Sequence, residues 1–293
     1  MDRSGPKSAR AWKAYYARER DELGAQGLAA TFDRAPRVAL PTEGALVFPH
    51  TKARDSGHLV AAVARAVIES RVEEVLALGV LHGAREEDAG EVTRAKAGDA
   101  AAREKLRRVH DASSSFVSEE FSLDAFVALL EVAASIAGVR APRVHERFPF
   151  LVGATPEDLP GLDELRALRA RGCAVVATTD PIHHGVGYGT DAREALPLDD
   201  DRTVGFACAC IDAQLEALAR RDFSAFARAA EACRSDFRDV GPTLTTLLEE
   251  ANGSVRELVL VDYADALAVP APTWVAAPLI AFALAQSTVS MRA

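Results

Sequence analysis

Three histidines in this chain each follow an apolar run that has the length of a buried strand. His50 comes after residues 46–49, His82 comes after residues 75–81, and His183 comes after a third such run. Imidazole titrates near neutral pH and is the commonest metal-binding side chain in proteins. Because open α/β sheets place ligands at the carboxyl ends of their strands, we expect His50, His82 and His183 to converge on one rim of a sheet.

The third run is followed by a segment, residues 178–189, that contains one proline, two adjacent histidines and three glycines. This composition predicts an irregular loop after the strand. A few histidines that leave coordination positions open suit zinc, iron or copper. A histidine after a strand is also an ordinary hydrogen-bonded loop residue, and the spacing of these three forms no compact motif such as HExxH.

The composition places the chain among ordinary globular proteins. Its 293 residues are 49% hydrophobic and carry a net charge of −9. The negative charge argues against a protein built mainly to bind nucleic acid or an anionic membrane. The first 20 residues hold no hydrophobic signal core, and no uninterrupted apolar run is long enough to span a membrane, so we expect a cytoplasmic location. The four cysteines form no CxxC pair, which predicts reduced thiols.

Apolar runs of strand length alternate with segments of helical periodicity from residue 36 onward. This alternation predicts a single α/β domain, residues 36–293, with a mostly parallel or mixed central sheet flanked by helices. We expect residues 1–35 to form an N-terminal helical arm without a chemical role. The highly charged segment 85–111 is expected to be an exposed, partly helical insertion. Pro242 is expected in the first turn of a helix.

Several segments that surround these residues occur together in one known family. Phe48-Pro49-His50 with Ser56-Gly57 resembles a PHAGYxxSG segment, residues 78–82 resemble an LGPSH strand end, and residues 179–185 resemble an SDFCHWG segment. Residues 148–153 are similar to an LPFL segment, and residues 257–265 to a late strand that ends in a tyrosine and a small residue. In this order the segments resemble the Memo-like family, described as AmmeMemoRadiSam system protein B.

The resemblance implies a fold and a site. The Memo-like family is similar in fold to the class III extradiol dioxygenases, which hold non-haem iron with two histidines and a carboxylate. By resemblance, His50 and His82 are metal ligands and His183 is the catalytic acid or base. The third ligand of the family is a cysteine before a glycine, where this chain has Val240-Gly241. Asp239 is adjacent but would point the other way on a strand.

Two readings of the site follow from the valine at position 240. In one, His183 or His184 becomes the third ligand, so that His50, His82 and His183 hold the metal. In the other, Val240 packs in a pocket that no longer binds metal. The family's EHSLE segment is also altered here, at residues 120–124, with loss of its histidine. If position 240 faces the histidines, Val240→Cys should raise the affinity for copper or iron.

The sequence therefore predicts a Memo-like metal-binding protein that works as an oxidoreductase dependent on non-haem iron or copper, with dioxygenase-like chemistry. The expected cofactor is a divalent metal, with iron or copper ahead of zinc, or no cofactor at all. The alternatives are a non-catalytic interaction protein with a degenerate metal pocket and a metal-assisted hydrolase. The expected partner is a small-molecule substrate or a peptide, with neither nucleic acid nor a membrane involved.

Overall fold

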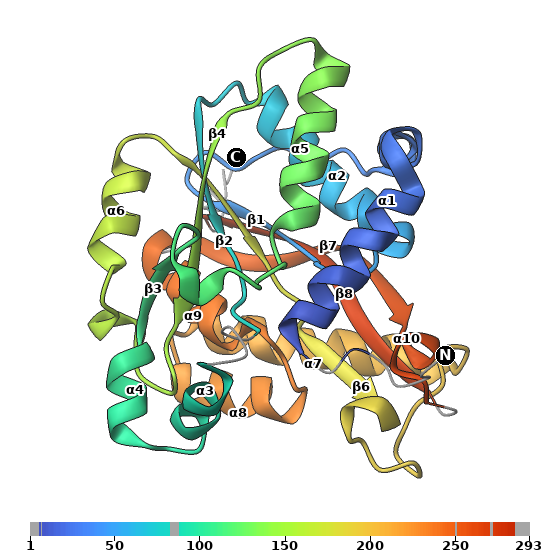
Figure 1. Ribbon diagram of the computed structural model, residues 1–293, viewed down its shortest axis with the longest axis vertical. Coiled ribbons are helices and arrows are strands. Elements are labelled where there is room, and N and C mark those ends of the chain that lie inside the picture. The colour runs from blue at the N-terminus through green and yellow to red at the C-terminus, as the bar shows by residue number, and fades with distance from the viewer. Residues whose placement is uncertain (1–5, 7, 83–87, 250, 270–271, 285–293) are drawn as a thin grey trace, which may run out of the picture.

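A mixed sheet of eight strands forms the centre of the structure (Figure 1). The computed structural model describes residues 6, 8–82, 88–249, 251–269 and 272–284. Within these residues the strand order is β3-β4-β2-β5-β1-β8-β6. Strand β7 pairs with the edge of β8 opposite to the one that pairs with β1 and β6. The strands are β1 Ala45–Phe48, β2 Glu74–Leu78, β3 Arg108–Asp111, β4 Arg143–Phe150, β5 Ala174–Thr178, β6 Ile182–Gly185, β7 Ala251–Asp262 and β8 Thr273–Leu284.

Four neighbouring strands, β4, β2, β5 and β1, run parallel to one another. Their carboxyl ends therefore lie along one edge of the sheet, and their amino ends lie along the opposite edge. The pairings of β3 with β4 and of β8 with β1, β6 and β7 are antiparallel. The predicted α/β fold with a mixed central sheet and flanking helices is confirmed.

Helices cover both faces of the sheet because the parallel strands are apolar on both faces. In β1, Ala45 and Val47 belong to one apolar core, while Leu46 and Phe48 belong to the other. The first core lies under α6, α7, α8 and α9, and the second lies under α1, α2 and α5 (Figure 1). These helices are α1 Ala9–Arg34, α2 Ala53–Glu69, α5 Asp124–Ala137, α6 Leu162–Ala170, α7 Asp201–Ala219, α8 Phe223–Ala232 and α9 Phe237–Leu248.

Three shorter α-helices are α3 Ala89–Lys96, α4 Ala100–Leu106 and α10 Ala264–Leu267, and three 3-10 helices are η2 Ser115–Val117, η3 Pro156–Asp158 and η4 Val186–Tyr188. Of the helices that the structure describes, none combines the length and the apolar character needed to cross a bilayer.

The prediction of an irregular loop over residues 178–189 is wrong for the middle part of this segment. Residues Ile182–Gly185 form strand β6, which pairs with β8 so that His183 lies opposite Val275. Glycine and proline indicate a loop by composition, but the free edge of β8 offers partners for this backbone. Gly185 has φ of 103°, and a Cβ atom there would lie 1.9 Å from the Pro272 carbonyl oxygen, so only glycine fits.

Two further expectations are corrected. The segment 85–111 is not only an exposed insertion, because its end forms β3 and pairs with β4, after α3 and α4; residues 85–87 lie outside the described part. Pro242 does not lie in a first helical turn, because α9 already begins at Phe237 and Pro242 is inside it. The acidic residue that precedes α9, Asp236, is its N-cap residue.

Candidate metal centre

The parallel strands bring two of the predicted histidines to the same edge of the sheet. His50 follows the carboxyl end of β1, His82 follows that of β2, and Asp180 follows that of β5. Strand β5 lies between β2 and β1, so the three side chains come from adjacent strand ends. His183 reaches the same pocket from β6.

His50 and His82 face each other through their Nε2 atoms, which are 3.1 Å apart. Nδ1 of His50 lies 3.0 Å from the Thr178 hydroxyl, which itself donates to the Phe48 carbonyl oxygen at 2.8 Å. The hydroxyl therefore accepts from Nδ1–H of His50. Nδ1–H of His82 donates to the Glu120 carboxylate at 3.0 Å. Each neutral ring then turns an Nε2 lone pair toward the other, and such a pair requires a proton or a metal ion between them.

Glu120 fixes the orientation of His82. Its carboxylate is almost fully buried and also accepts from the backbone N–H groups of His82 at 2.7 Å, Phe121 at 2.8 Å and Ser122 at 2.9 Å. A carboxylate that holds the far nitrogen of a metal-binding imidazole fixes its tautomer and raises its basicity. In the sequence, residues 120–124 stand out only as an altered family segment, and nothing there indicates this role of Glu120.

Asp236 supplies the third group. Its Oδ2 atom lies 3.0 Å from Nε2 of His50 and 3.6 Å from Nε2 of His82. Its Oδ1 atom accepts from the Thr179 hydroxyl at 3.1 Å and from the Asp180 N–H at 2.7 Å, which fixes the carboxylate. Oδ2 is buried and accepts no hydrogen bond from the residues that the structure describes. This free buried oxygen is directed at the two histidines.

The three atoms have the spacing of a metal site. They are separated by 3.0, 3.1 and 3.6 Å. Ligands about 2.1 Å from an ion lie about 3.0 Å apart at octahedral angles and about 3.4 Å apart at tetrahedral angles. Two histidines and one carboxylate on one side of the ion, with open positions opposite, form the triad of non-haem iron(II) enzymes. His50, His82 and Asp236 therefore fit a divalent metal.

The charges of the site favour a cation. Burial opposes protonation of His82, but the carboxylates of Glu120 and Asp236 outweigh it and raise its pKa to about 10. The pKa of His50 is also raised, because Asp180 and Asp236 outweigh the effect of burial. Burial would raise the pKa of Asp236, but the neighbouring histidines hold it well below its usual range. Burial raises the pKa of Asp180 to about 7.

His183 lies in the same pocket but in a different set of contacts. Its Nδ1–H donates to the Arg234 carbonyl oxygen at 2.8 Å, and its backbone N–H donates to the Cys233 carbonyl oxygen at 3.0 Å. One of its ring nitrogens lies within 4.8 Å of carboxylate oxygens of Asp180 and Asp236, and these three groups could also hold a metal ion. Burial lowers the pKa of His183, so its ring is neutral at pH 7 and Nε2 is available as a base. The structure thus places His183, the predicted third ligand, in the same pocket as His50 and His82, and it brings the Asp236 carboxylate to both of those histidines.

Aromatic side chains form the wall of the pocket. Trp12 and Tyr16 of α1 line it together with Phe121, Tyr188 and Tyr263, and the cavity has a volume of about 180 Å³. The hydroxyl groups of Tyr16 and Tyr263 are hydrogen-bonded at 2.7 Å. Helix α1 therefore forms part of the pocket wall. The expectation was that residues 1–35 form an arm without a chemical role. An apolar wall of this kind excludes water and limits the size of a ligand.

The other two candidate ligands do not face the histidines. Nε2 of His184 accepts from the Leu196 N–H at 2.9 Å, and the His184 ring stacks on Trp274. Val240 is fully buried in the apolar core below α9. Position 240 lies on a helix and not on a strand, so the strand assumed for the direction of Asp239 is wrong.

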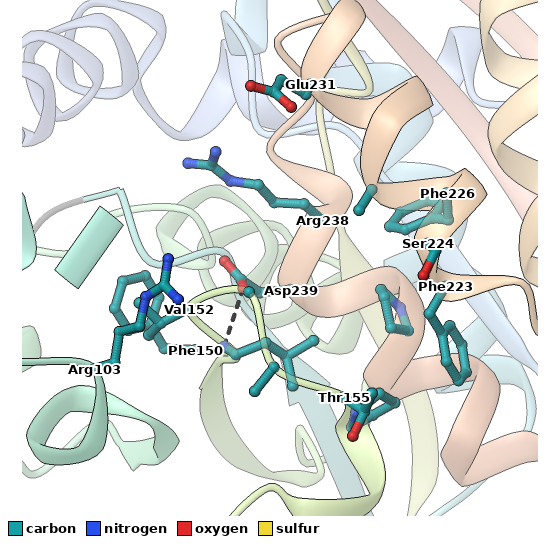
Figure 2. A pocket seen from close by; sticks show the side chains of 16 residues that line it. Arg103, Phe150, Val152, Thr155, Phe223, Ser224, Phe226, Glu231, Arg238 and Asp239 are labelled. Atoms are coloured by element: carbon teal, nitrogen blue, oxygen red, sulfur yellow. Dashed lines mark hydrogen bonds between the residues drawn. The ribbon is translucent and has the colours of Figure 1, made fainter. Parts of the chain in front are cut away.

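A larger cavity of about 370 Å³ lies between the end of β4 and the first turns of α9 (Figure 2). Figure 2 shows Arg103 and Arg238 on either side of Asp239, whose carboxylate accepts from the Leu151 N–H at 3.0 Å. None of the three predicted histidines lines this cavity. The candidate metal-binding and acid–base side chains His50, His82, Asp180 and His183 line the smaller, aromatic pocket.

The chain matches none of the family models and none of the curated proteins.

Proposed function

We propose that this protein is a Memo-like, metal-dependent oxidoreductase with class III dioxygenase-like chemistry, in which His50, His82 and Asp236 hold iron(II). One observation carries the proposal: the Nε2 atoms of both histidines and the Oδ2 atom of Asp236 lie 3.0 to 3.6 Å apart. The other polar atoms of these side chains are held by hydrogen bonds, which leaves these three atoms for an ion.

The carboxylate supports iron over softer metals. A thiolate at the third position would favour copper(I), whereas two imidazoles and one carboxylate are typical of iron(II). An iron(II) ion in such a triad supplies Lewis acidity and one-electron redox chemistry. Copper remains the second choice among the expected metals, and zinc the third.

The residues around the triad bind the substrate and move its proton. Nε2 of the neutral His183 points into the pocket and accepts a proton from an acidic substrate hydroxyl, while the Arg234 carbonyl oxygen holds Nδ1. Tyr188 contacts the His183 ring edge-on, with centroids 4.8 Å apart, and restricts its rotation. The apolar wall from α1 keeps water away from the proton transfer.

A metal-assisted hydrolase is the second candidate. The carboxyl of Asp180 is buried, has a pKa of about 7, and lies 3.4 Å from Nε2 of His50. A carboxyl of this kind at the edge of a metal site serves as a general base for water. The third candidate, a non-catalytic interaction protein, is favoured by the loss of the family's ligand at position 240. The Asp236 carboxylate, close to both histidines, would take the place of that ligand and so weakens this argument.

Metal analysis and oxygen uptake test the proposal. Purified protein, loaded anaerobically with iron(II), should bind one equivalent and consume oxygen with members of a panel of catechols. Asp236→Asn should lose both the metal and the uptake. Asp239→Asn is the matched control, because this carboxylate lies in the first turn of α9 and contacts the Leu151 N–H. A wild-type protein that binds no iron, or binds it and never consumes oxygen, would contradict the proposal; ester or amide hydrolysis would then favour the second candidate.

A further inference from the structure

A second group of metal-binding side chains lies at the opposite edge of the sheet. Glu74 is the first residue of β2, His145 lies near the start of β4, and Cys173 directly precedes β5. These are the amino ends of the parallel strands, whereas the triad described above lies beyond their carboxyl ends. The two groups share no residue.

The strand register explains why these three residues meet. Leu76 of β2 lies opposite His145, and Val75 lies opposite Ala174, so Glu74 lies beside Cys173 and diagonal to His145. Alternation along a strand places residues two apart on the same face. Leu76 and Cys173 both belong to the core under α6, so all three side chains lie on that face.

The group is compact and largely buried. Oε2 of Glu74 lies 3.4 Å from Nε2 of His145 and 3.5 Å from Sγ of Cys173. The exposed fraction is 8% for His145 and 6% for Cys173. Nε2 of His145 is buried and has no hydrogen-bond partner among the described residues, although it is directed at the carboxylate. A buried imidazole nitrogen that has only this ion-pair contact and no hydrogen bond is costly in the absence of a ligand.

We propose that Glu74, His145 and Cys173 form a second metal site, which takes Zn²⁺ or another borderline-soft divalent ion. This second site is independent of the oxidoreductase function proposed above.

Two of the three ligand separations and the donor set fit zinc, and all three ligand atoms lie within 4.8 Å of one another. With zinc–sulfur bonds of about 2.3 Å and zinc–nitrogen or zinc–oxygen bonds of about 2.0 Å, tetrahedral ligands lie about 3.5 Å apart for sulfur and oxygen and about 3.3 Å apart for nitrogen and oxygen. The observed separations are 3.5 and 3.4 Å. One thiolate, one imidazole and one carboxylate leave a fourth position for water. The thiol binds as thiolate, so binding releases one proton to solvent.

Two arginines moderate the affinity of this site. Nη2 of Arg171 lies 3.6 Å from Glu74 Oε2, and Nη1 of Arg143 lies 3.9 Å from Oε1. Their side chains are 56% and 74% exposed, so both are able to turn toward solvent when an ion binds. The Arg171 charge still opposes a cation, and its removal should strengthen binding by about three- to tenfold.

Cobalt(II) distinguishes the two sites because a thiolate ligand gives it an intense near-ultraviolet charge-transfer band. The triad contains no sulfur, so the band reports the second site alone. Metal-stripped Asp236→Asn protein titrated with cobalt(II) should develop the band with one equivalent, and zinc should displace it. Cys173→Ser should abolish the band, and His145→Gln should weaken cobalt binding at least tenfold. Arg171→Gln should bind more tightly.

Cys208→Ser is the matched control, because Cys208 is an exposed free thiol. It should leave the band unchanged. Circular dichroism shows whether each variant is folded, and zinc should raise the melting temperature of Asp236→Asn but not of the double variant Asp236→Asn, Cys173→Ser. If folded wild type gives no thiolate band, or if the band survives in Cys173→Ser, the second site does not exist as proposed.

Discussion

Replacement of Glu120 by glutamine tests how the protein controls its candidate metal centre. Glu120 is buried, accepts from Nδ1–H of His82 at 3.0 Å, and holds that ring toward His50. Glutamine keeps the shape but removes the charge. Glu119→Gln is the matched control, because the neighbouring Glu119 pairs with Arg10 and has no contact with His82 among the ones described.

The structure gives the expected magnitude. Burial opposes the charge on His82, but Glu120 and Asp236 raise its pKa to about 10. A metal that binds at pH 7 must displace this proton, and the difference, 10 − 7 = 3 pH units, lowers the apparent affinity by about a thousandfold. Glu120→Gln lowers the pKa and relieves that competition. It also removes the orienting carboxylate, which should lower the intrinsic affinity by about 10- to 100-fold.

The two effects separate in a pH series. In competition with a chelator between pH 6 and 9, the wild-type affinity should rise about tenfold for each pH unit, whereas the Glu120→Gln affinity should level off earlier. The variant should be clearly weaker at pH 9 and closer to wild type at pH 6. Parallel profiles for the two proteins would refute the argument that Glu120 sets the proton competition at His82.

The stability of the metal-free protein gives an independent check with a defined sign. The pKa of His82 is raised from its usual 6.5, so its contribution to folding is complete below pH 6.5 and is lost as the pH rises through about 10. Wild type should therefore lose more stability than Glu120→Gln between pH 7 and pH 10 when both are metal-free. Chemical denaturation at each pH measures this difference, and an equal loss would contradict it.

Three further changes have expected outcomes. Val240→Cys should leave metal affinity unchanged, because Val240 is buried in the apolar core; a gain in a chelator titration would place this position at the site after all. His183→Ala should keep the metal content but lose oxygen uptake, because in the proposed function His183 moves the substrate proton while His50, His82 and Asp236 hold the ion. Loss of metal would make His183 a ligand, as its grouping with Asp180 and Asp236 also allows. Gly185→Ala should destabilise the fold by more than about 2 kcal/mol in denaturant unfolding, because φ is 103° and the new Cβ would meet the Pro272 carbonyl oxygen. Gly205→Ala, with nothing within 4 Å, is its control and should stabilise helix α7 by up to about 1 kcal/mol.

The sequence predicted those parts of the site that depend on strands. Leu46 to Phe48 and Val75 to Leu78 are apolar runs without interruption, as strands covered on both faces require, and each is followed by its histidine. The positions of His50 and His82 at one rim follow from parallel strands alone. The apolar pattern of the two strands is therefore sufficient to predict that these two residues lie near each other.

The sequence could not identify Asp236 as the third side chain of the candidate metal centre. An acidic residue before a helix is usually an N-cap, and Asp236 holds that position before α9. Its direction toward the histidines depends on the chain path between α8 and α9 and on the bonds from Thr179 and Asp180. Strand β6 was missed for a similar reason, since its composition indicates a loop and only the neighbouring edge of β8 makes it a strand.

The hydrogen bond between the hydroxyl groups of Tyr16 and Tyr263 joins residues 247 positions apart in the chain. During synthesis, the helix that carries Tyr16 leaves the ribosome long before its partner is made. The pocket therefore has no complete wall until Tyr263 has been translated, although His50 and His82 are already present. Non-local contacts of this kind form late in folding. The wall of the pocket, and with it any selectivity for a metal and a ligand, is therefore complete only after the segment that carries Tyr263 has been made.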